Sequence, residues 1–397
     1  MKTIGKLHAR PALRVGLAAM VVLIGSGLPP LHAASPDVQL LWEARWPAEP
    51  LPYVYGVAVS GNYAYLGHDT AGLKVVDVGN PASCSQVGSS HTGGYARELV
   101  VRANYLYVAN VSEGLQVFDV SNPTNCVLVG GHNTSGFARD VAVSGNYAYV
   151  ADDTAGLHVI DVSNPTNCVR VGGYNTTSAA LGVGVSGNYA YVADWDSGLQ
   201  VIDVSNPANC QRIGGFNTSG QARGVAIAGN YAYVADSRSG LQVIDVSNPT
   251  NCVRVGGCTI GGYTIAVTLA GHLAYVSGVP FGVKVVDVSN PTNCVLVVGP
   301  GDGAVLSRVV LADKRIYAAD AETGLRVFFT MPGAQFTVRV DAETNQPFTL
   351  EAATDLSGAG NWSPLVTTNV PAMPFDFVDF DVRIAEKPQK FYRVRQP

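Results

Sequence analysis

The stretch DVAVSGNYAYVADDTAGLHVIDVSNPTNCVRVGGYNTTSAALG, residues 140–182, is one copy of a unit that recurs with a spacing of 42 residues. The sequence Gly-Leu-x-Val, or a close variant, begins at Gly72, Gly114, Gly156, Gly198, Gly240, Gly282 and Gly324. Self-similarity at such a period is typical of repeat architectures, in which each unit buries its apolar faces against its neighbours. The sequence therefore predicts an array of seven similar units.

Each unit divides into four short strands. In the quoted copy the apolar and alternating segments are Val141–Val143, Tyr147–Ala151, Leu157–Val162 and Cys168–Val171. The intervening Ser144–Asn146 is a tight hairpin signal, and the turn at Ser163–Asn167 contains a proline that a central strand excludes. Leu157–Val162 is apolar on both faces, so it is covered on both faces. Four antiparallel strands stacked face to face around an axis form the blade of a β-propeller.

The ends of the array favour a closed ring over an open solenoid, which would need polar caps. The seventh copy stops after Gly324–Phe328 and lacks a fourth strand. Val38–Trp46 precedes the first copy, and counting back 42 residues from Cys84 reaches Trp42 within it. We therefore predict an all-β fold, a seven-bladed β-propeller of four-stranded blades over residues 36–330, in which this N-terminal strand completes the last blade.

The repeat also resembles a known family. GLHVIDVSNP at 156–165 and GLQVIDVSNP at 198–207 and 240–249 resemble the LVIVD repeat of bacterial secreted and surface proteins. SGNYAYVAD at 144–152 and 186–194 is similar to that family and to the related YVTN-type propellers. The resemblance covers residues 36–330 and implies a propeller scaffold. It implies little about biochemistry, so function has to be argued from the site.

Residues 1–33 are predicted to be a signal peptide. Four basic residues precede an apolar run over 15–28, and Ala33 and Ala34 follow it. A membrane anchor is the alternative, but the run is shorter than the roughly 20 residues that a span needs. We expect a secreted, periplasmic or cell-surface protein with no transmembrane span in the mature chain. Without residues 1–33 the formal net charge changes from −5 to −9, which argues against nucleic acid as a partner.

The period ends near residue 333, and residues 335–397 form a separate β-rich module in our interpretation. Strands are predicted over Phe336–Val340, Phe348–Ala352, Trp362–Thr367, Phe375–Val382 and Phe391–Val394. We expect a small β-sandwich-like domain. LEAATDLSGAGNWSPL at 350–365 and FYRVR at 391–395 are similar to a C-terminal module on other secreted bacterial proteins.

Six of the seven cysteines keep the period of the repeat: Cys84, Cys126, Cys168, Cys210, Cys252 and Cys294. Equivalent outer positions in adjacent blades are expected to be more than ~10 Å apart, whereas a disulfide needs Cα atoms within about 7 Å. The same separation argues against a shared metal ion. These cysteines are therefore predicted to pack within the blades. A pair between Cys252 and the seventh cysteine, Cys258, stays open, and we expect no metal and no cofactor.

The candidate site lies on the face where the loops vary between copies, because irregular loops on a rigid scaffold are the usual place for binding. One candidate set is Arg97, Arg139 and Arg223, just before the innermost strand. A second is Asp152, Asp194, Asp236 and Asp320, at the ends of second strands, and a third is Trp195 with Asp196 in an irregular loop. Arginines suit a carboxylate or sulfate, and aspartates suit sugar hydroxyls or calcium. The alternatives are arginines paired with neighbouring acids, aspartates that cap their own turns, and a packed tryptophan.

No catalytic set stands out, since catalysis needs an asymmetric group of residues around one reacting atom. We expect a non-enzymatic scaffold that recognises a protein or polysaccharide on the variable face, at the cell envelope or outside the cell. Two alternatives remain: an extracellular hydrolase or lyase that acts at the channel mouth, and a structural matrix component.

Overall fold

The computed structural model describes residues 38–47, 54–298, 304–313 and 315–332, together with five strands between 336 and 395. The predicted signal peptide over residues 1–33 lies outside this part of the chain. Within it, no helix has the length and apolar character that crossing a membrane requires.

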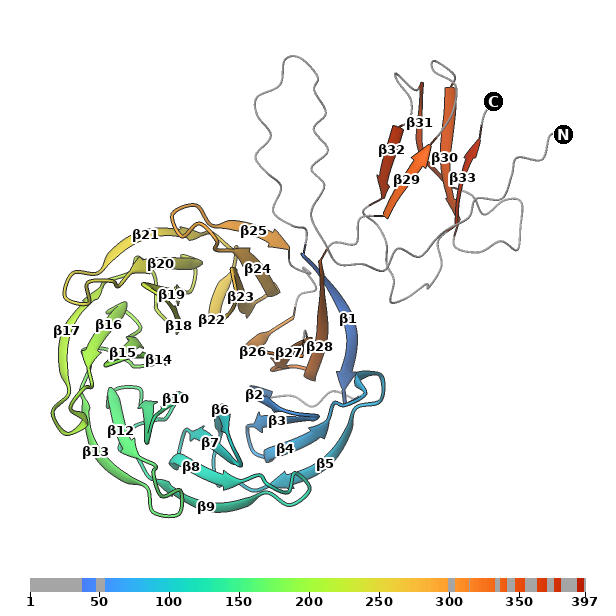
Figure 1. The fold of residues 1–397 in the computed structure, drawn as a ribbon. Helices are drawn as coiled ribbons and strands as arrows, with labels where there is room; N and C mark the ends of the chain where they lie inside the picture. The colour runs from blue at the N-terminus through green and yellow to red at the C-terminus, as the bar shows by residue number, and fades with distance from the viewer. Residues whose placement is uncertain are drawn as a thin grey trace. The chain divides into compact units, whose positions relative to one another are not determined.

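The chain folds into seven four-stranded antiparallel sheets arranged as the blades of a propeller (Figure 1). The first four blades are β2 (Val54–Ser60), β3 (Tyr63–His68), β4 (Gly72–Asp77) and β5 (Ser85–Ser90); β6 (Ala96–Arg102), β7 (Tyr105–Asn110), β8 (Gly114–Asp119) and β9 (Val127–His132); β10 (Asp140–Ser144), β11 (Tyr147–Ala151), β12 (Leu157–Asp161) and β13 (Val169–Tyr174); and β14 (Gly182–Ser186), β15 (Tyr189–Ala193), β16 (Leu199–Asp203) and β17 (Gln211–Phe216).

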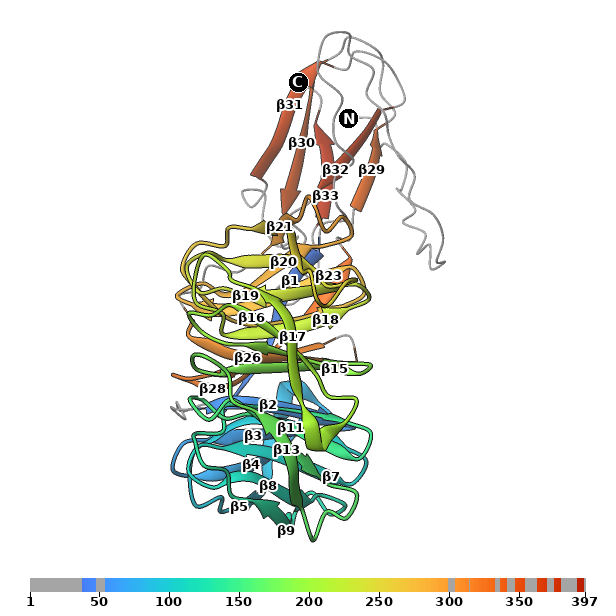
Figure 2. The ribbon, with the colours of Figure 1, turned by 90° about the vertical axis from the view of Figure 1, so that its left-hand side faces the viewer.

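The last three blades are β18 (Gly224–Ala228), β19 (Tyr231–Ala235), β20 (Leu241–Asp245) and β21 (Val253–Cys258); β22 (Tyr263–Ala270), β23 (Leu273–Val279), β24 (Gly282–Asp287) and β25 (Val295–Val298); and β26 (Leu306–Ala312), β27 (Arg315–Asp320), β28 (Gly324–Pro332) and β1 (Val38–Trp46). In each blade the first of these strands lies nearest the axis and the fourth lies outermost (Figure 1). The outer strands β13 and β17 face the viewer in Figure 2.

The ring is closed by strands from both ends of the array. β1 pairs antiparallel with β28, from Val38 opposite Pro332 to Trp46 opposite Leu325. The seventh sheet therefore has the order β1-β28-β27-β26, as the missing fourth strand predicts. Side chains of the first and seventh blades share one buried cluster, which includes Val57 and Val327. The prediction of a closed seven-bladed propeller is confirmed.

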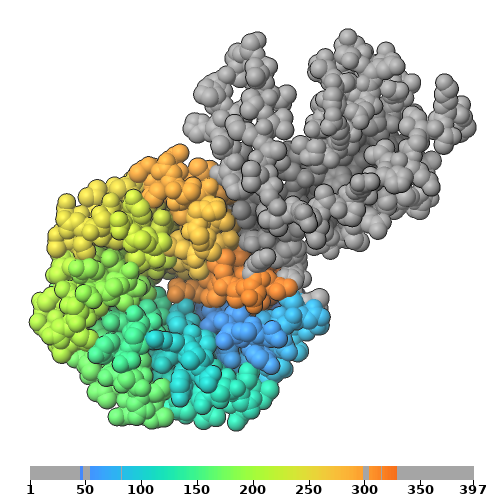
Figure 3. Space-filling model, in the orientation of Figure 1, coloured from blue at the N-terminus to red at the C-terminus, as the bar shows by residue number. Residues whose placement is uncertain are grey.

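The core lies between adjacent blades. Tyr149, Leu157 and Val159 of the third blade pack in one cluster with Val192 and Ile202 of the fourth. Leu157, Val159, Val192 and Ile202 are all fully buried. A strand that is apolar on both faces is covered by a blade on each side, which explains why the third strands do not alternate. Figure 3 shows the blades packed side by side with little open space at the centre.

The turns between third and fourth strands are fixed by their own side chains. In the third blade, Oδ1 of Asp161 accepts from the Ser163 amide at 2.8 Å, and Cys168 Sγ donates to the Pro165 carbonyl at 3.4 Å. In two blades this turn includes a short 3-10 helix, η1 (Pro81–Ser83) and η2 (Pro207–Asn209). All seven cysteines are free. The periodic cysteines therefore pack within the blades, as predicted, and Cys252 does not pair with Cys258.

Five further strands follow the propeller: β29 (Phe336–Val340), β30 (Pro347–Ala353), β31 (Ser363–Asn369), β32 (Phe375–Asp379) and β33 (Phe391–Arg395). They form a two-stranded sheet, β29-β32, and a three-stranded sheet in the order β31-β30-β33. Each strand overlaps a predicted one. The sandwich and the resemblance to a known module stay predictions.

Candidate functional site

A β-bulge at the start of the innermost strand shapes the site in four of the seven blades. In the second blade the register of β6 on β7 shifts between Ala96 and Glu98, which leaves Arg97 as the extra residue. The first, sixth and seventh blades show the same shift, between Val54 and Gly56, Thr264 and Ala266, and Leu306 and Arg308. Successive side chains of a regular strand point to opposite faces, but a bulge redirects one of them. Arg97 and Glu98 consequently line the same cavity.

This cavity has a volume of about 310 Å³. Its rim positions, one per blade, are Tyr55, Arg97, Arg139, Leu181, Arg223, Ile265 and Ser307. The residue after each rim position is a floor position, and four of these line the cavity: Glu98, Asp140, Ala266 and Arg308. Glu98 and Asp140 are only 6% and 3% exposed, so the floor lies deeper than the half-buried rim arginines. All seven blades thus contribute to one site, through the first strand or the residue directly before it.

Each rim arginine is held by a neighbouring side chain. The guanidinium carbon of Arg97 lies 4.0 Å from the centre of the Tyr55 ring, and that of Arg223 lies 4.5 Å from the Trp195 ring. Arg139 instead donates from Nη2 to Asp153 Oδ2 at 2.6 Å. Stacking on an aromatic face orients a guanidinium while leaving its N–H groups available.

Two of these arginines have unsatisfied donors. The Nε atoms of Arg97 and Arg223 are buried and have no hydrogen-bond partner within the described part of the chain. Burial lowers the pKa of both guanidiniums from the ordinary value, and the charge of Arg139 lowers that of Arg97 further. A buried donor without a partner costs free energy, which a bound anion would offset. The rim is therefore suited to a negatively charged group.

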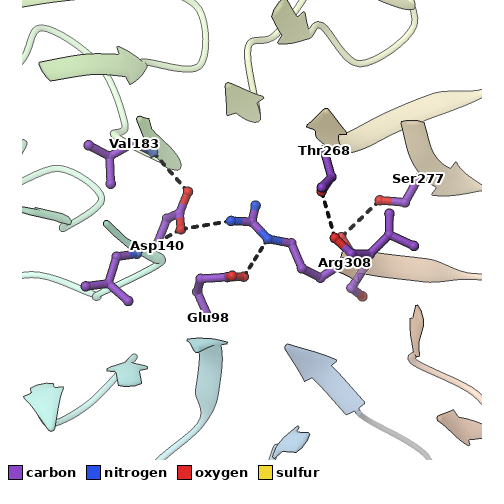
Figure 4. A network of polar contacts seen from close by, with 9 residues as sticks. Glu98, Asp140, Val183, Thr268, Ser277 and Arg308 are labelled. Atoms are coloured by element: carbon purple, nitrogen blue, oxygen red, sulfur yellow. Dashed lines mark hydrogen bonds and ion pairs between the residues drawn. The ribbon is translucent and has the colours of Figure 1, made fainter. Parts of the chain in front are cut away.

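The floor is an ion-pair network that crosses the channel (Figure 4). Arg308 of the seventh blade places Nε 2.9 Å from Glu98 Oε2 and Nη2 3.3 Å from Asp140 Oδ1. Asp140 also accepts from the amides of Val141 at 2.8 Å and Val183 at 2.9 Å. One guanidinium thus serves two carboxylates from two other blades.

Burial of these carboxylates changes their protonation. Burial raises the pKa of Glu98 to about 8, with Asp140 raising it and Arg308 lowering it. Burial also raises the pKa of Asp140, although Arg308 and two backbone amides oppose the shift. Because the three groups lie so close together, they titrate as a unit. The floor therefore offers both acceptors and donors, while the rim offers donors.

The structure contradicts the expected ring of aspartates at the channel mouth. Asp152, Asp194, Asp236 and Asp320 are fully buried and do not line the cavity. Asp236 accepts from Thr218 Oγ1 at 2.6 Å and from the Gly220 amide at 2.9 Å, and so ties its turn to the connection from the preceding blade. Asp152 binds its preceding connection in the same way, through Thr134. Asp152, Asp236 and Asp320 bind groups within their own loops and connections, and all four carboxylates are buried away from the cavity, so they are unavailable to a ligand there.

The irregular loop at Trp195 contributes indirectly. The ring of Trp195 supports Arg223, and the exposed Asp196 accepts from Gln221 Nε2 at 3.2 Å. The main residue that sequence reasoning missed is Arg308. The repeat spacing could have found it, because position 308 lies five periods of 42 residues after Glu98 and four after Asp140. Opposite charges at one register position of a closed ring face one another across the axis.

Comparison with known proteins identifies the repeat. Six copies of the LVIVD repeat match at residues 53–92, 93–134, 135–176, 179–218, 219–259 and 261–299. The chain belongs to the LVIVD repeat family. The six LVIVD copies correspond to the first six blades, and the seventh blade, which both ends of the array build, lies outside them.

Among solved structures, this LVIVD protein is similar to the computationally designed Ika8 protein. The two are 11% identical, with a TM-score of 0.55, and the match covers 73% of this chain and 99% of that chain. At that identity the likeness shows the fold alone. No curated protein matches the chain.

Proposed function

We propose that this protein is a non-enzymatic binding scaffold that recognises an acidic group of a protein or polysaccharide at the mouth of the propeller channel. One observation carries the proposal: Arg97, Arg139 and Arg223 converge on a single cavity, and two of them keep buried Nε donors that nothing in the described chain satisfies. Arginine is the side chain best shaped to bind carboxylates and related oxyanions. With the predicted signal peptide, this favours a role at the envelope or outside the cell.

The test is binding of the mature protein to immobilised carboxylated and sulfated polysaccharides and to acidic peptides. Arg97→Gln/Arg223→Gln is expected to weaken binding at least tenfold, since each lost charge-assisted hydrogen bond contributes about 1.5–3 kcal/mol. Arg102→Gln is the matched control, because Arg102 is exposed at the last position of β6, whereas Arg97 lies near the start of the same strand, at the opposite face of the propeller. Equal binding by the double variant and the wild type would refute an arginine site.

The enzyme alternative also has one observation in its favour. Glu98 and Asp140 lie in the same cavity, and burial raises the pKa of both carboxyl groups. Carboxyl groups with different protonation are the usual basis of general acid–base catalysis. Turnover of an acidic polysaccharide that disappears in Glu98→Gln would establish a hydrolase or lyase. Binding without turnover supports the scaffold.

A further inference from the structure

The cavity is not uniform around its circumference. Arg97 and Arg139 occupy the rim of the second and third blades. On the sixth and seventh blades the lining includes the apolar side chains Ile265, Ala266, Val305 and Ala321, beside Ser307 and Arg308. A ligand that fills this space therefore meets rim guanidinium groups at the second, third and fifth blades and apolar side chains at the sixth and seventh.

Besides the rim arginines and the apolar lining, the floor offers hydrogen-bonding groups. Asp140 and Glu98 each bind Arg308, yet a carboxylate oxygen can accept more than one hydrogen bond. A second negative charge on the ligand would be repelled at this depth, whereas a hydroxyl would donate to these oxygens or accept from Arg308. The floor thus favours neutral hydroxyl groups, and the rim favours the anion.

Size restricts the ligand further. A volume of about 310 Å³ lies at the lower end of the range for small-molecule sites, roughly 300–1,000 Å³. This is more space than a bare oxyanion fills. Because Arg308 crosses the channel to Glu98 and Asp140, a chain that enters from the rim meets the floor network instead of threading through.

Resting on the proposed function, we infer that the cavity binds the terminal residue of an acidic glycan, a hexuronate. Its carboxylate contacts the rim arginines, the C–H face of its ring packs on Ile265 and Val305, and its hydroxyls reach Glu98, Asp140 and Arg308. The following sugars extend outward past Phe137, which is 54% exposed and whose ring centre lies 5.7 Å from the Arg139 guanidinium carbon.

The experiment is isothermal titration calorimetry of the mature protein with four probes: glucuronate, glucose, benzoate and inorganic sulfate. Glucuronate has a negative charge, hydroxyl groups and a ring. Glucose lacks the charge, benzoate lacks the hydroxyls, and sulfate lacks the ring. We expect glucuronate to bind about tenfold or more tightly than each of the others, which corresponds to one or two additional hydrogen bonds.

Variants separate the contributions. Arg97→Gln is expected to weaken glucuronate and sulfate alike. Ile265→Thr keeps the β-branched shape but removes apolar surface, so it is expected to weaken glucuronate severalfold and leave sulfate unchanged. Arg102→Gln is the control that changes neither.

Each other result overturns the inference in a recognisable way. If sulfate binds as tightly as glucuronate, the cavity is a general anion site, which overturns the hexuronate but keeps the proposed function. If benzoate binds most tightly, the ligand is an apolar acid. If glucose equals glucuronate, the arginines do not select the ligand. If none of the anions binds, both the inference and the proposed function fail.

Discussion

Arg308 Nε lies 2.9 Å from Glu98 Oε2, so an ion pair joins the seventh blade to the second across the first. The same guanidinium places Nη2 3.3 Å from Asp140 Oδ1 of the third blade. The blades otherwise pack mainly against their immediate neighbours, in clusters of apolar side chains. This network therefore connects non-adjacent blades and forms the floor of the candidate site at the same time.

Removal of the Arg308 guanidinium should destabilise the fold. Arg308→Met leaves the buried Asp140 without its counter-charge and Glu98 Oε2 without its donor, and breaking such a network costs about 3–5 kcal/mol. The free energy of unfolding at pH 7, measured in urea, is expected to fall by that amount. Arg102→Met, at an exposed arginine, is expected to change it by less than about 0.5 kcal/mol. Equal effects of the two substitutions would show that the network contributes nothing.

Glu98 should make stability depend on pH in a defined direction. Burial raises its pKa in the folded protein from 4.5 to about 8, so the folded state holds this proton more tightly than the unfolded state. The resulting stabilisation is fully present below about pH 4.5 and is lost as the pH rises through about 8. Wild type should therefore lose stability relative to Glu98→Gln between pH 5 and pH 9. If the unfolding free energies of wild type and Glu98→Gln change in parallel across that range, the pKa of Glu98 is not raised in the folded protein.

The sequence predicts the fold well because a fixed period makes every copy independent evidence for the others. Tyr147–Ala151 is predicted with the bounds of β11, and Val38–Trp46 with those of β1. The strand Val38–Trp46 follows from counting one repeat of 42 residues back from Cys84, since a closed ring of similar blades leaves one defined place for the missing fourth strand of the seventh blade. Such an argument needs no side-chain geometry.

The site could be predicted only in part, because burial of a loop residue depends on what folds over it. Arg97, Arg139 and Arg223 share a register position and are found by the same counting. Asp152 shares its register with other aspartates in the same way, yet the connection at Thr134 covers it. Whether a periodic side chain faces the axis or a neighbouring loop is decided by bulges and connections, which the spacing does not reveal.

The buried aspartates should affect stability and not binding. Asp236→Ala removes the acceptor of Thr218 Oγ1 and of the Gly220 amide, which is expected to lower the free energy of unfolding by about 1–3 kcal/mol. Asp196→Ala, in the exposed neighbouring loop, is expected to change it by less than about 0.5 kcal/mol. Chemical denaturation measures both. A large loss of ligand affinity in Asp236→Ala at unchanged stability would return this residue to the list of ligand contacts.

The exposed ring of Phe137 should matter for polymers and not for single sugars. Arg139 Nη2 lies 2.6 Å from Asp153 Oδ2, so the Arg139 guanidinium keeps its position when the Phe137 ring is removed. Phe137→Ser is therefore expected to leave glucuronate binding unchanged and to weaken binding of a uronate trisaccharide severalfold, because the outer sugars lose an apolar surface. Calorimetry with both ligands checks this. Equal loss for the two ligands would mean that Phe137 acts through Arg139.

The closing strand should be essential for a monomeric propeller. A chain that lacks residues 1–47 has no β1, so β28 presents an unpaired edge that promotes association with other chains. We expect this chain to aggregate in size-exclusion chromatography, while a chain that lacks only residues 1–35 stays monomeric. Adding a synthetic peptide of residues 36–47 to the shorter chain should restore monomer, because the peptide supplies the missing fourth strand. A monomeric shorter chain with an unchanged unfolding midpoint would show that the seventh blade is stable with three strands.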